Sequence, residues 1–254
     1  MTRPAPALWA VRDRLSPDAR RLARRVADTL LEPVGSITGA TGVGRRFAIT
    51  FDDGPDPSTT PAVLAVLGAH RVRATFFVLV ERAEAQPALV RRLLDEGHEV
   101  GLHGLDHARL TTLRSDEVET QVAGGRRRLE RVTGRKVRLF RPPYGAQSLR
   151  TWRAARRAGL HVVVWDGHAE DWADHPAATV AANAAAALRP GGILLLHDAL
   201  AGDPREPKPP RPRFDRAEAV DRFLAGLPAA GWRPGTVGRL LAAGRPRHTA
   251  WFRP

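Results

Sequence analysis

Short apolar runs that alternate with helical patterns are the feature that most constrains this fold. The runs are Phe47–Phe51, Ala74–Val80, Glu99–His103, Val137–Phe140, His161–Trp165 and Ile193–Leu196, with a weak further one at Trp232. Helix-start signals lie between them, at Thr60-Pro61, Gln86-Pro87, Ser115-Asp116, Ser148 and His175-Pro176. Strands that alternate with helices form parallel sheets covered by helices, so about seven such units predict an α/β fold, a distorted (β/α)7-type barrel.

The chain length allows one barrel domain with short extensions at either end. Of the 254 residues, we expect 1–44 to form an N-terminal extension, 45–243 the barrel and 244–254 a C-terminal tail. Within the extension, Ser16-Pro17 followed by apolar residues at helical spacing predicts an amphipathic helix over residues 17–32. The favoured interpretation is a helix packed on the barrel; contact with a membrane, an anionic polymer or a partner is the alternative.

Composition excludes several classes of site. The chain has no cysteine, so disulfides, thiolate metal sites and cysteine nucleophiles are ruled out, and any metal must bind His, Asp or Glu. The apolar stretch near the N-terminus is interrupted by charges at Arg12–Arg14, which argues against a signal peptide, and no run is long enough to span a bilayer. These features predict a cytoplasmic location.

The strong positive charge of the chain does not by itself predict a nucleic-acid partner. There are 40 Lys+Arg against 27 Asp+Glu, a net charge of +13. Lys136 and Lys208 are the lysines, and the arginines are spread along the chain without an aromatic-laced basic stripe. We therefore interpret the charge as a product of GC-rich coding and expect no nucleic-acid partner.

Ionisable residues cluster just after the apolar runs. They are Asp52 and Asp53, His103 and His107, Arg141, Asp166 to Asp171, and His197 with Asp198. Because the carboxyl ends of parallel barrel strands share one face, where the active sites of such barrels lie, we expect these side chains to converge.

One part of this set predicts a metal site. His103 and His107 are four residues apart, a spacing that one helical turn would bring to the same side of an ion. Asp53 could add a carboxylate oxygen, which gives three ligands and open positions for water and substrate. On an extended chain Asp52 and Asp53 would point to opposite sides, so one could bind metal while the other accepts a proton.

The same residues form an ordered set of motifs. The motifs are Thr50-Phe-Asp-Asp-Gly-Pro55, His103-x-x-x-His107, Arg141-Pro-Pro-Tyr-Gly145, Asp171-Trp172 and Leu195-Leu-His197. In order and in strand-end context they resemble the NodB-type polysaccharide deacetylases, carbohydrate esterase family 4. The resemblance covers Phe47 to Leu241. It implies a NodB-type barrel that removes N-acetyl groups from an amino-sugar polymer or glycoconjugate.

The resemblance also implies a role for each matching residue. Asp53, His103 and His107 would hold one divalent metal, with zinc expected before cobalt, nickel or manganese. Asp52 would be the general base that deprotonates the attacking water, and His197 the general acid that protonates the leaving amine.

The remaining motif residues would support this reaction. Arg141 would tune the base and would itself be held by Asp171. The backbone N–H of Tyr144 would help to stabilise the oxyanion. Leu195 would line the acetyl pocket, and Trp172 would flank the sugar groove.

Two departures and two alternatives accompany this interpretation. Gly104 stands where the family usually has Ser or Thr, which predicts a looser metal loop, and His168 stands where an acid is common. The proline-rich segment Asp203–Pro212 is expected to be a surface loop, either one that shapes the substrate site or a disordered insertion. The same metal site could instead deacylate a non-polymeric biosynthetic intermediate or an O-acetyl ester, or the barrel could bind glycans without catalysis.

Overall fold

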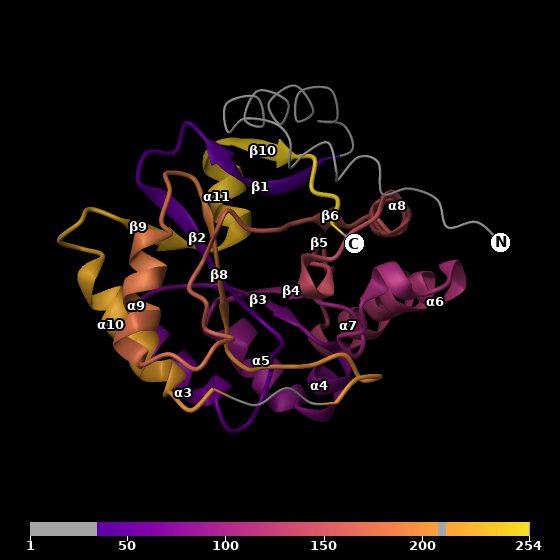
Figure 1. Cartoon of the computed structure of the whole chain (residues 1–254), viewed down its shortest axis with the longest axis horizontal. Coiled ribbons are helices and arrows are strands. Elements are labelled where there is room, and N and C mark those ends of the chain that lie inside the picture. The colour runs from indigo at the N-terminus through magenta and orange to yellow at the C-terminus, as the bar shows by residue number, and fades with distance from the viewer. Residues whose placement is uncertain (1–34, 208–211, 254) are drawn as a thin grey trace, which may run out of the picture.

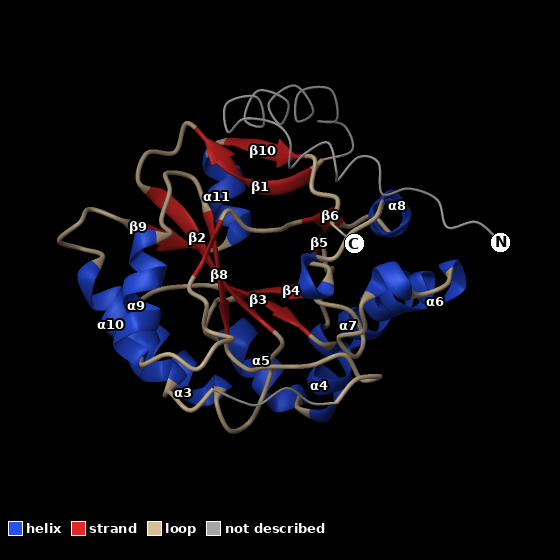
Figure 2. Ribbon diagram, in the orientation of Figure 1, coloured by secondary structure: helices blue, strands red, loops and turns tan. Residues whose placement is uncertain are grey.

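The computed structural model describes residues 35–207 and 212–253. Its main sheet is 8-stranded and parallel throughout, in the order β6-β5-β4-β3-β2-β8-β7, with β9 beside β2. The strands are β2 (Arg46–Asp52), β3 (Thr75–Val78), β4 (Glu99–Leu102), β5 (Leu139–Phe140), β6 (His161–Val162), β7 (Gly167–His168), β8 (Ile193–His197) and β9 (Arg233–Gly235). The strands gather in the middle of the molecule with helices outside them (Figure 2). The predicted α/β fold is confirmed.

The sheet curls because both of its edges come from one segment of the chain. The edge strands β6 and β7 lie within residues 161–168, so the sheet returns to its own starting point. Near this seam, Ile37 bridges Val163, and Gly39 bridges Gly192. The result is a distorted barrel whose strands all end at the same face.

The helices cover the outside of the barrel (Figure 1). They are α3 (Thr60–Ala69), α4 (Val80–Ala85), α5 (Pro87–Asp95), α6 (Ser115–Glu119), α7 (Gly125–Thr133), α8 (Leu149–Arg157), α9 (Ala177–Ala186), α10 (Arg216–Gly226) and α11 (Val237–Ala243). A π-helical turn at Thr120–Gly124 joins α6 to α7, and 3-10 turns occupy Leu110–Thr112 and Pro143–Gly145. The predicted helix starts coincide with those of α3, α5, α6 and α8. A proline lies in the first turn of α3 and α5, Ser148 caps α8, and the Glu117 side chain accepts the Arg114 N–H at the start of α6.

Two apolar cores hold the barrel. Alternate residues of β2 such as Ile49 and Phe51 pack against the helices, together with Leu64 and Leu67 of α3. A second cluster that includes Phe77, Leu139, Val163 and Ile193 packs with α11. Since β2 is buried on both faces, its sequence is almost continuously apolar up to Asp52.

A short antiparallel sheet joins the two ends of the described chain. Strand β1 (Ser36–Thr41) pairs with β10 (Arg245–Thr249). Sequence patterns predicted neither strand; β1 lies in the predicted extension and β10 in the predicted tail, and the domain limits stay a prediction. The predicted helix over residues 17–32 lies outside the described residues. The part of the predicted loop within Asp203–Pro212 that is described contains neither helix nor strand.

Candidate active site

The predicted site residues converge at the carboxyl ends of the strands. Asp52 ends β2 and lies opposite His197 of β8 in the strand register. His103 follows β4 directly and Arg141 follows β5. Their side chains are buried, apart from a small exposed fraction of His197. The convergence follows from the parallel sheet, which delivers every strand end to one face.

The two aspartates do not point to opposite sides as expected. Asp53 has a φ of 76°, a left-handed conformation that breaks the alternation of an extended strand. In consequence, Asp52 Oδ2 lies 3.8 Å and Asp53 Oδ1 3.3 Å from the same atom, Nε2 of His103. Both carboxylates therefore face one cluster.

The two histidines meet on a loop, which corrects the expected helical turn. Gly104 has a φ of 93° and His107 one of 72°, so the chain between them curls without helical hydrogen bonds. The side-chain oxygen of Gln121 accepts the Leu105 N–H at 2.8 Å, and its amide nitrogen donates to Asp106. Gln121, which sequence reasoning missed, therefore holds the loop between His103 and His107, in which Gly104 replaces the usual Ser or Thr.

Asp53, His103 and His107 form a possible metal site. Their ligand atoms all lie within 4.8 Å of one another, and Asp53 Oδ1 is 3.2 Å from His107 Nε2. Nδ1 of His103 contacts the Arg141 carbonyl at 2.8 Å, and Nδ1 of His107 contacts the Tyr144 hydroxyl at 3.0 Å. This arrangement directs both Nε2 atoms toward Asp53.

The donor set fits a divalent metal. Asp53 Oδ1 is buried and has no hydrogen-bond partner among the described residues, which an ion between the three side chains would supply. Burial alone would raise the pKa of Asp53, but His107 and His103 hold this pKa well below its usual range, so the carboxylate is charged. Two imidazoles and one carboxylate match a site that keeps positions open for water and substrate.

Arg141 fixes one side of Asp52. Its fully buried guanidinium donates from Nη1 to Asp52 Oδ1 at 2.7 Å and to the Thr50 hydroxyl at 2.8 Å, and it lies 4.2 Å from the centre of the Phe77 ring. Burial lowers the pKa of Arg141, and the charge of Asp52 opposes this change. Because Arg141 binds Oδ1 of Asp52, the other carboxylate oxygen, Oδ2, is the one that faces His103.

Asp171 holds His197 and not Arg141, which corrects the predicted contact. It accepts hydrogen bonds from His197 Nδ1 at 2.8 Å, from the His197 backbone N–H at 2.7 Å and from Arg216 at 3.1 Å. Burial alone would lower the pKa of His197, but the Asp171 carboxylate raises it to about 9. Arg216 gave no sequence signal, because it opens α10 far along the chain from both partners.

Exposed aromatic side chains flank the buried cluster. Tyr144 is 38% and Trp172 44% exposed, although large apolar side chains are mostly buried in the described protein. The Trp172 ring lies edge-on to His197 with centres 6.0 Å apart, and the Tyr144 ring lies 4.3 Å from that of His107. Leu195, two residues before His197 in β8, is buried.

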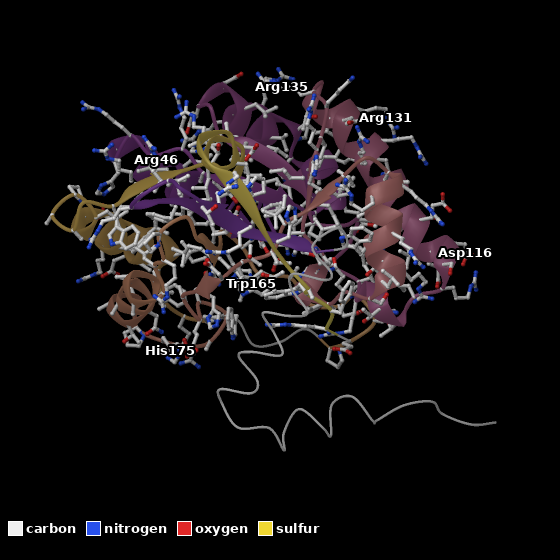
Figure 3. The ribbon with its side chains drawn as sticks, turned by 90° about the horizontal axis from the view of Figure 1, so that it is seen from above. Arg46, Asp116, Arg131, Arg135, Trp165 and His175 are labelled. Carbon is white, nitrogen blue, oxygen red and sulfur yellow. The ribbon has the colours of Figure 1, made fainter. Side chains whose placement is uncertain are left out.

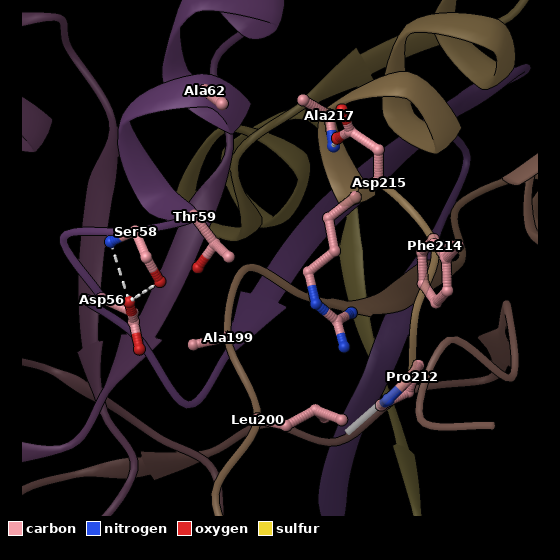
Figure 4. Close-up of a pocket in the computed structure, with 11 residues that line it drawn as sticks. Asp56, Ser58, Thr59, Ala62, Ala199, Leu200, Pro212, Phe214, Asp215 and Ala217 are labelled. Carbon is pink, nitrogen blue, oxygen red and sulfur yellow. Dashed lines mark hydrogen bonds between the residues drawn. The ribbon is translucent and has the colours of Figure 1, made fainter. Parts of the chain in front are cut away.

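A hollow of about 310 Å³ lies beside the turn that follows His197. Thr59 lies on one wall and Phe214 on the other (Figure 4), and Arg216 also lines the hollow. Next to it, the Thr60 hydroxyl donates to the buried carboxylate of Asp198. A Cβ on Gly54 would lie 2.0 Å from that carboxylate, so the close approach requires glycine in the Asp-Asp-Gly-Pro segment.

A curled strand–helix barrel with a buried acid, imidazole and possible metal set at its strand ends is an arrangement suited to catalysis, metal-assisted hydrolysis included. Comparison with known proteins makes the class specific. Residues 40–163 match the family model described as polysaccharide deacetylase. A peptidoglycan-N-acetylglucosamine deacetylase of Bacillus cereus is 33% identical over 214 residues, which cover 83% of this chain and 95% of that protein. This chain belongs to the polysaccharide deacetylase family, a family of N-deacetylases.

Solved structures agree with this assignment. The Bc1960 peptidoglycan N-acetylglucosamine deacetylase, solved with a bound hydroxamate-type benzamide, has a TM-score of 0.75 and 28% identity, covering 90% of this chain and 100% of that one. A protein from Bacillus anthracis described as a family 4 pseudoenzyme has a TM-score of 0.69 and 25% identity, covering 78% of this chain and 66% of that one. In the part of the chain that the structure describes, no helix is long and apolar enough to cross a membrane.

Proposed function

We propose that this protein is a metal-dependent hydrolase that removes N-acetyl groups from an amino-sugar polymer or glycoconjugate. The observation that carries the proposal is the placement of the Asp52 carboxylate and the His197 imidazole beside the Asp53–His103–His107 cluster. An amide is a poor substrate for water alone, because its hydrolysis needs a base, an electrophile and an acid for the leaving nitrogen. This site offers a candidate for each.

Asp53, His103 and His107 would hold the ion, for which zinc is the first choice. When bound, the metal supplies Lewis-acid polarisation of the acetyl carbonyl and makes a nucleophile available near neutral pH. The chain's own contribution is to fix the three donors: the Arg141 carbonyl and the Tyr144 hydroxyl engage the outer ring nitrogens of the histidines.

Asp52 and His197 carry out the two proton transfers in this proposal. With Oδ1 bound by Arg141, Asp52 presents Oδ2 as the base that takes the proton of the attacking water. His197 is protonated at neutral pH because Asp171 raises its pKa to about 9, so it can give a proton to the departing amine. Arg141 and Asp171 are positioning residues, each acting through the proton-transferring group that it contacts.

Substrate contacts are assigned to three further residues. The backbone N–H of Tyr144 would stabilise the developing oxyanion, Leu195 would contact the acetyl methyl, and Trp172 would stack on a sugar ring. The exposure of the Trp172 ring beside His197 supports this last role. Names of relatives supply the candidate substrates, peptidoglycan and chitooligosaccharides, in both of which N-acetylglucosamine carries the acyl group.

Acetate release tests the proposal. The full-length protein is incubated with N-acetylglucosamine oligomers and peptidoglycan fragments, with zinc or cobalt and with a chelator. We expect release that requires metal and that falls by at least about 100-fold in Asp52→Asn, because general-base catalysis contributes about 10²–10⁴-fold. The exposed Asp95→Asn serves as the matched control and keeps full activity.

Three outcomes would refute or redirect the assignment. Full activity of Asp52→Asn or of the chelated protein would refute the mechanism. Turnover of monosaccharide conjugates or O-acetyl esters but not of oligomers would favour a non-polymeric substrate. Glycan binding by metal-loaded protein without any turnover would favour a non-catalytic barrel, a possibility raised by the pseudoenzyme among the similar structures.

A further inference from the structure

We propose that the end of the barrel opposite the active site binds an anionic phospholipid surface. The strands of the main sheet are parallel, so all of them begin at this end, and the loops that lead into them lie there together. We call this surface the basic end and define it by Arg46, Arg71, Arg73, Arg135, Lys136 and Arg138. The proposal does not depend on the reaction at the opposite end.

Topology gathers these residues from separate parts of the chain. Arg46 begins β2, Arg71 and Arg73 lie in the connection to β3, and the others lie between α7 and β5. The side chains are exposed, and the strands that they precede belong to one continuous run of the sheet, β5-β4-β3-β2. Figure 3 shows Arg46, Arg131 and Arg135 on the same side of the molecule, with His175 toward the opposite side.

The charges of the basic end are not neutralised within the described protein. Some arginines on the outer helices form ion pairs, as Arg92 does with Glu96 and Arg128 with Glu84. In residues 35–207 and 212–253, no residue of the basic end has such a pair with a carboxylate. Two acids lie beside these loops: Glu96 pairs with Arg92, and Glu99 accepts hydrogen bonds from the Thr75 hydroxyl and the Gly238 N–H. The surface therefore carries a net positive charge available to an anionic partner.

At the opposite end, acids that follow the strands are paired within the described protein. Asp52 pairs with Arg141, Asp171 with His197 and Arg216, and Asp203 with Arg205. The unpaired cations of the basic end therefore favour an orientation with this end toward an anionic surface. A protein bound in this way presents its active site to the surrounding solution, where a large polymer can reach it.

The basic end lacks the aromatic groove of a single-stranded nucleic-acid site in the described part of the chain. Single-stranded nucleic acid binds in basic grooves lined by aromatic side chains on which the bases stack. Here the charges come from separate loops, and Trp232, an aromatic residue in these connections, has the Arg45 guanidinium 5.3 Å from its ring centre. Arg135, Lys136 and Arg138 also line a hollow of about 240 Å³, in which these three cations outnumber the one carboxylate, Glu99.

Vesicle co-sedimentation of the full chain tests the proposal. We expect binding to vesicles of phosphatidylcholine with phosphatidylglycerol, no binding to phosphatidylcholine alone, and loss of binding when salt rises from about 0.05 M to about 0.5 M. A basic residue near an anionic bilayer strengthens binding about five-fold. The triple variant Arg135→Gln, Lys136→Gln and Arg138→Gln should therefore bind about 100-fold more weakly, with unchanged acetate release.

A matched variant separates position from net charge. Arg91→Gln, Arg127→Gln and Arg153→Gln remove the same charge from exposed positions on α5, α7 and α8, and this variant should lose less than about five-fold in affinity. Equal losses in both variants, or no loss in the first, would overturn the proposal. So would tighter binding to soluble DNA or polyphosphate than to vesicles at the same phosphate concentration.

Discussion

Replacing Asp171 by Asn should move the alkaline limit of activity to lower pH. Asp171 accepts hydrogen bonds from both the ring Nδ1 and the backbone N–H of His197, and its negative charge stabilises the imidazolium. The rise of the His197 pKa from 6.5 to about 9 corresponds to about 3 kcal/mol in favour of the protonated ring. Asn keeps the size of the side chain but removes the charge, and the burial that remains lowers the pKa.

The size of the effect follows from the fraction of protonated His197. At about pH 7.5 a group with a pKa of about 9 is almost fully protonated, whereas one with an ordinary histidine pKa is protonated in about one molecule in ten. Activity at that pH should fall at least about 10-fold, and by more if the Asn amide also favours the wrong ring tautomer. The loss should shrink as the pH is lowered, because more of the variant's imidazole is then protonated.

The assay is kcat/KM for acetate release between about pH 5.5 and about pH 10 in the metal-loaded protein. Asp174→Asn, an exposed position in the same loop, provides the control and should leave the profile unchanged. Thermal melting checks that both variants are folded. An alkaline limit in Asp171→Asn at the same pH as in the unmodified protein would refute the argument that Asp171 sets the protonation of the acid.

Further predictions concern stability, metal binding and substrate. Arg141→Leu should destabilise the fold by about 3–5 kcal/mol in urea unfolding, because it leaves the buried Asp52 carboxylate without its partner; an unchanged midpoint would contradict the ion pair. Gly54→Ala should cost about 1–3 kcal/mol, because the new Cβ meets the Asp198 carboxylate, and calorimetry would measure it. Zinc at about 100 times its dissociation constant should stabilise the protein by about 2.7 kcal/mol and should fail to do so in His107→Ala; equal stabilisation of both proteins would place the metal elsewhere. Trp172→Ala should raise KM for oligomers more than it lowers kcat, and the reverse pattern would exclude a stacking role.

Much of the barrel could be predicted from sequence, because its elements are encoded locally. The apolar run at Phe47–Phe51 becomes the buried strand β2, and the prolines after Thr60 and Gln86 begin α3 and α5. Boundaries were less certain where an apolar run contained the end of one element and the start of the next. The apolar run at Ala74–Val80, for example, contains all of β3, and its last residue, Val80, is the first residue of α4.

Elements that depend on distant partners could not be predicted in this way. Strands β1 and β10 are rich in small, polar and basic residues and exist because the two ends of the described part of the chain pair with each other. The acidic and imidazole residues of the site were identifiable because parallel strands must bring their carboxyl ends to one face. Their mutual contacts were not, since Asp171 could reach either Arg141 or His197 until the barrel placed it beside the latter.

The sequence by itself therefore determined the order of the strands and helices and which residues supply the chemistry, because patterning and turn signals act over a few residues. Tertiary structure decided what these residues contact. The left-handed backbone conformation of Asp53 directs its carboxylate to the same histidine cluster that Asp52 faces. The fold also places Arg216 within hydrogen-bond distance of Asp171. It also gathered arginines that are evenly spread along the chain at one end of the barrel. Such contacts depend on how strands are ordered in space, and no local pattern of residues carries that information.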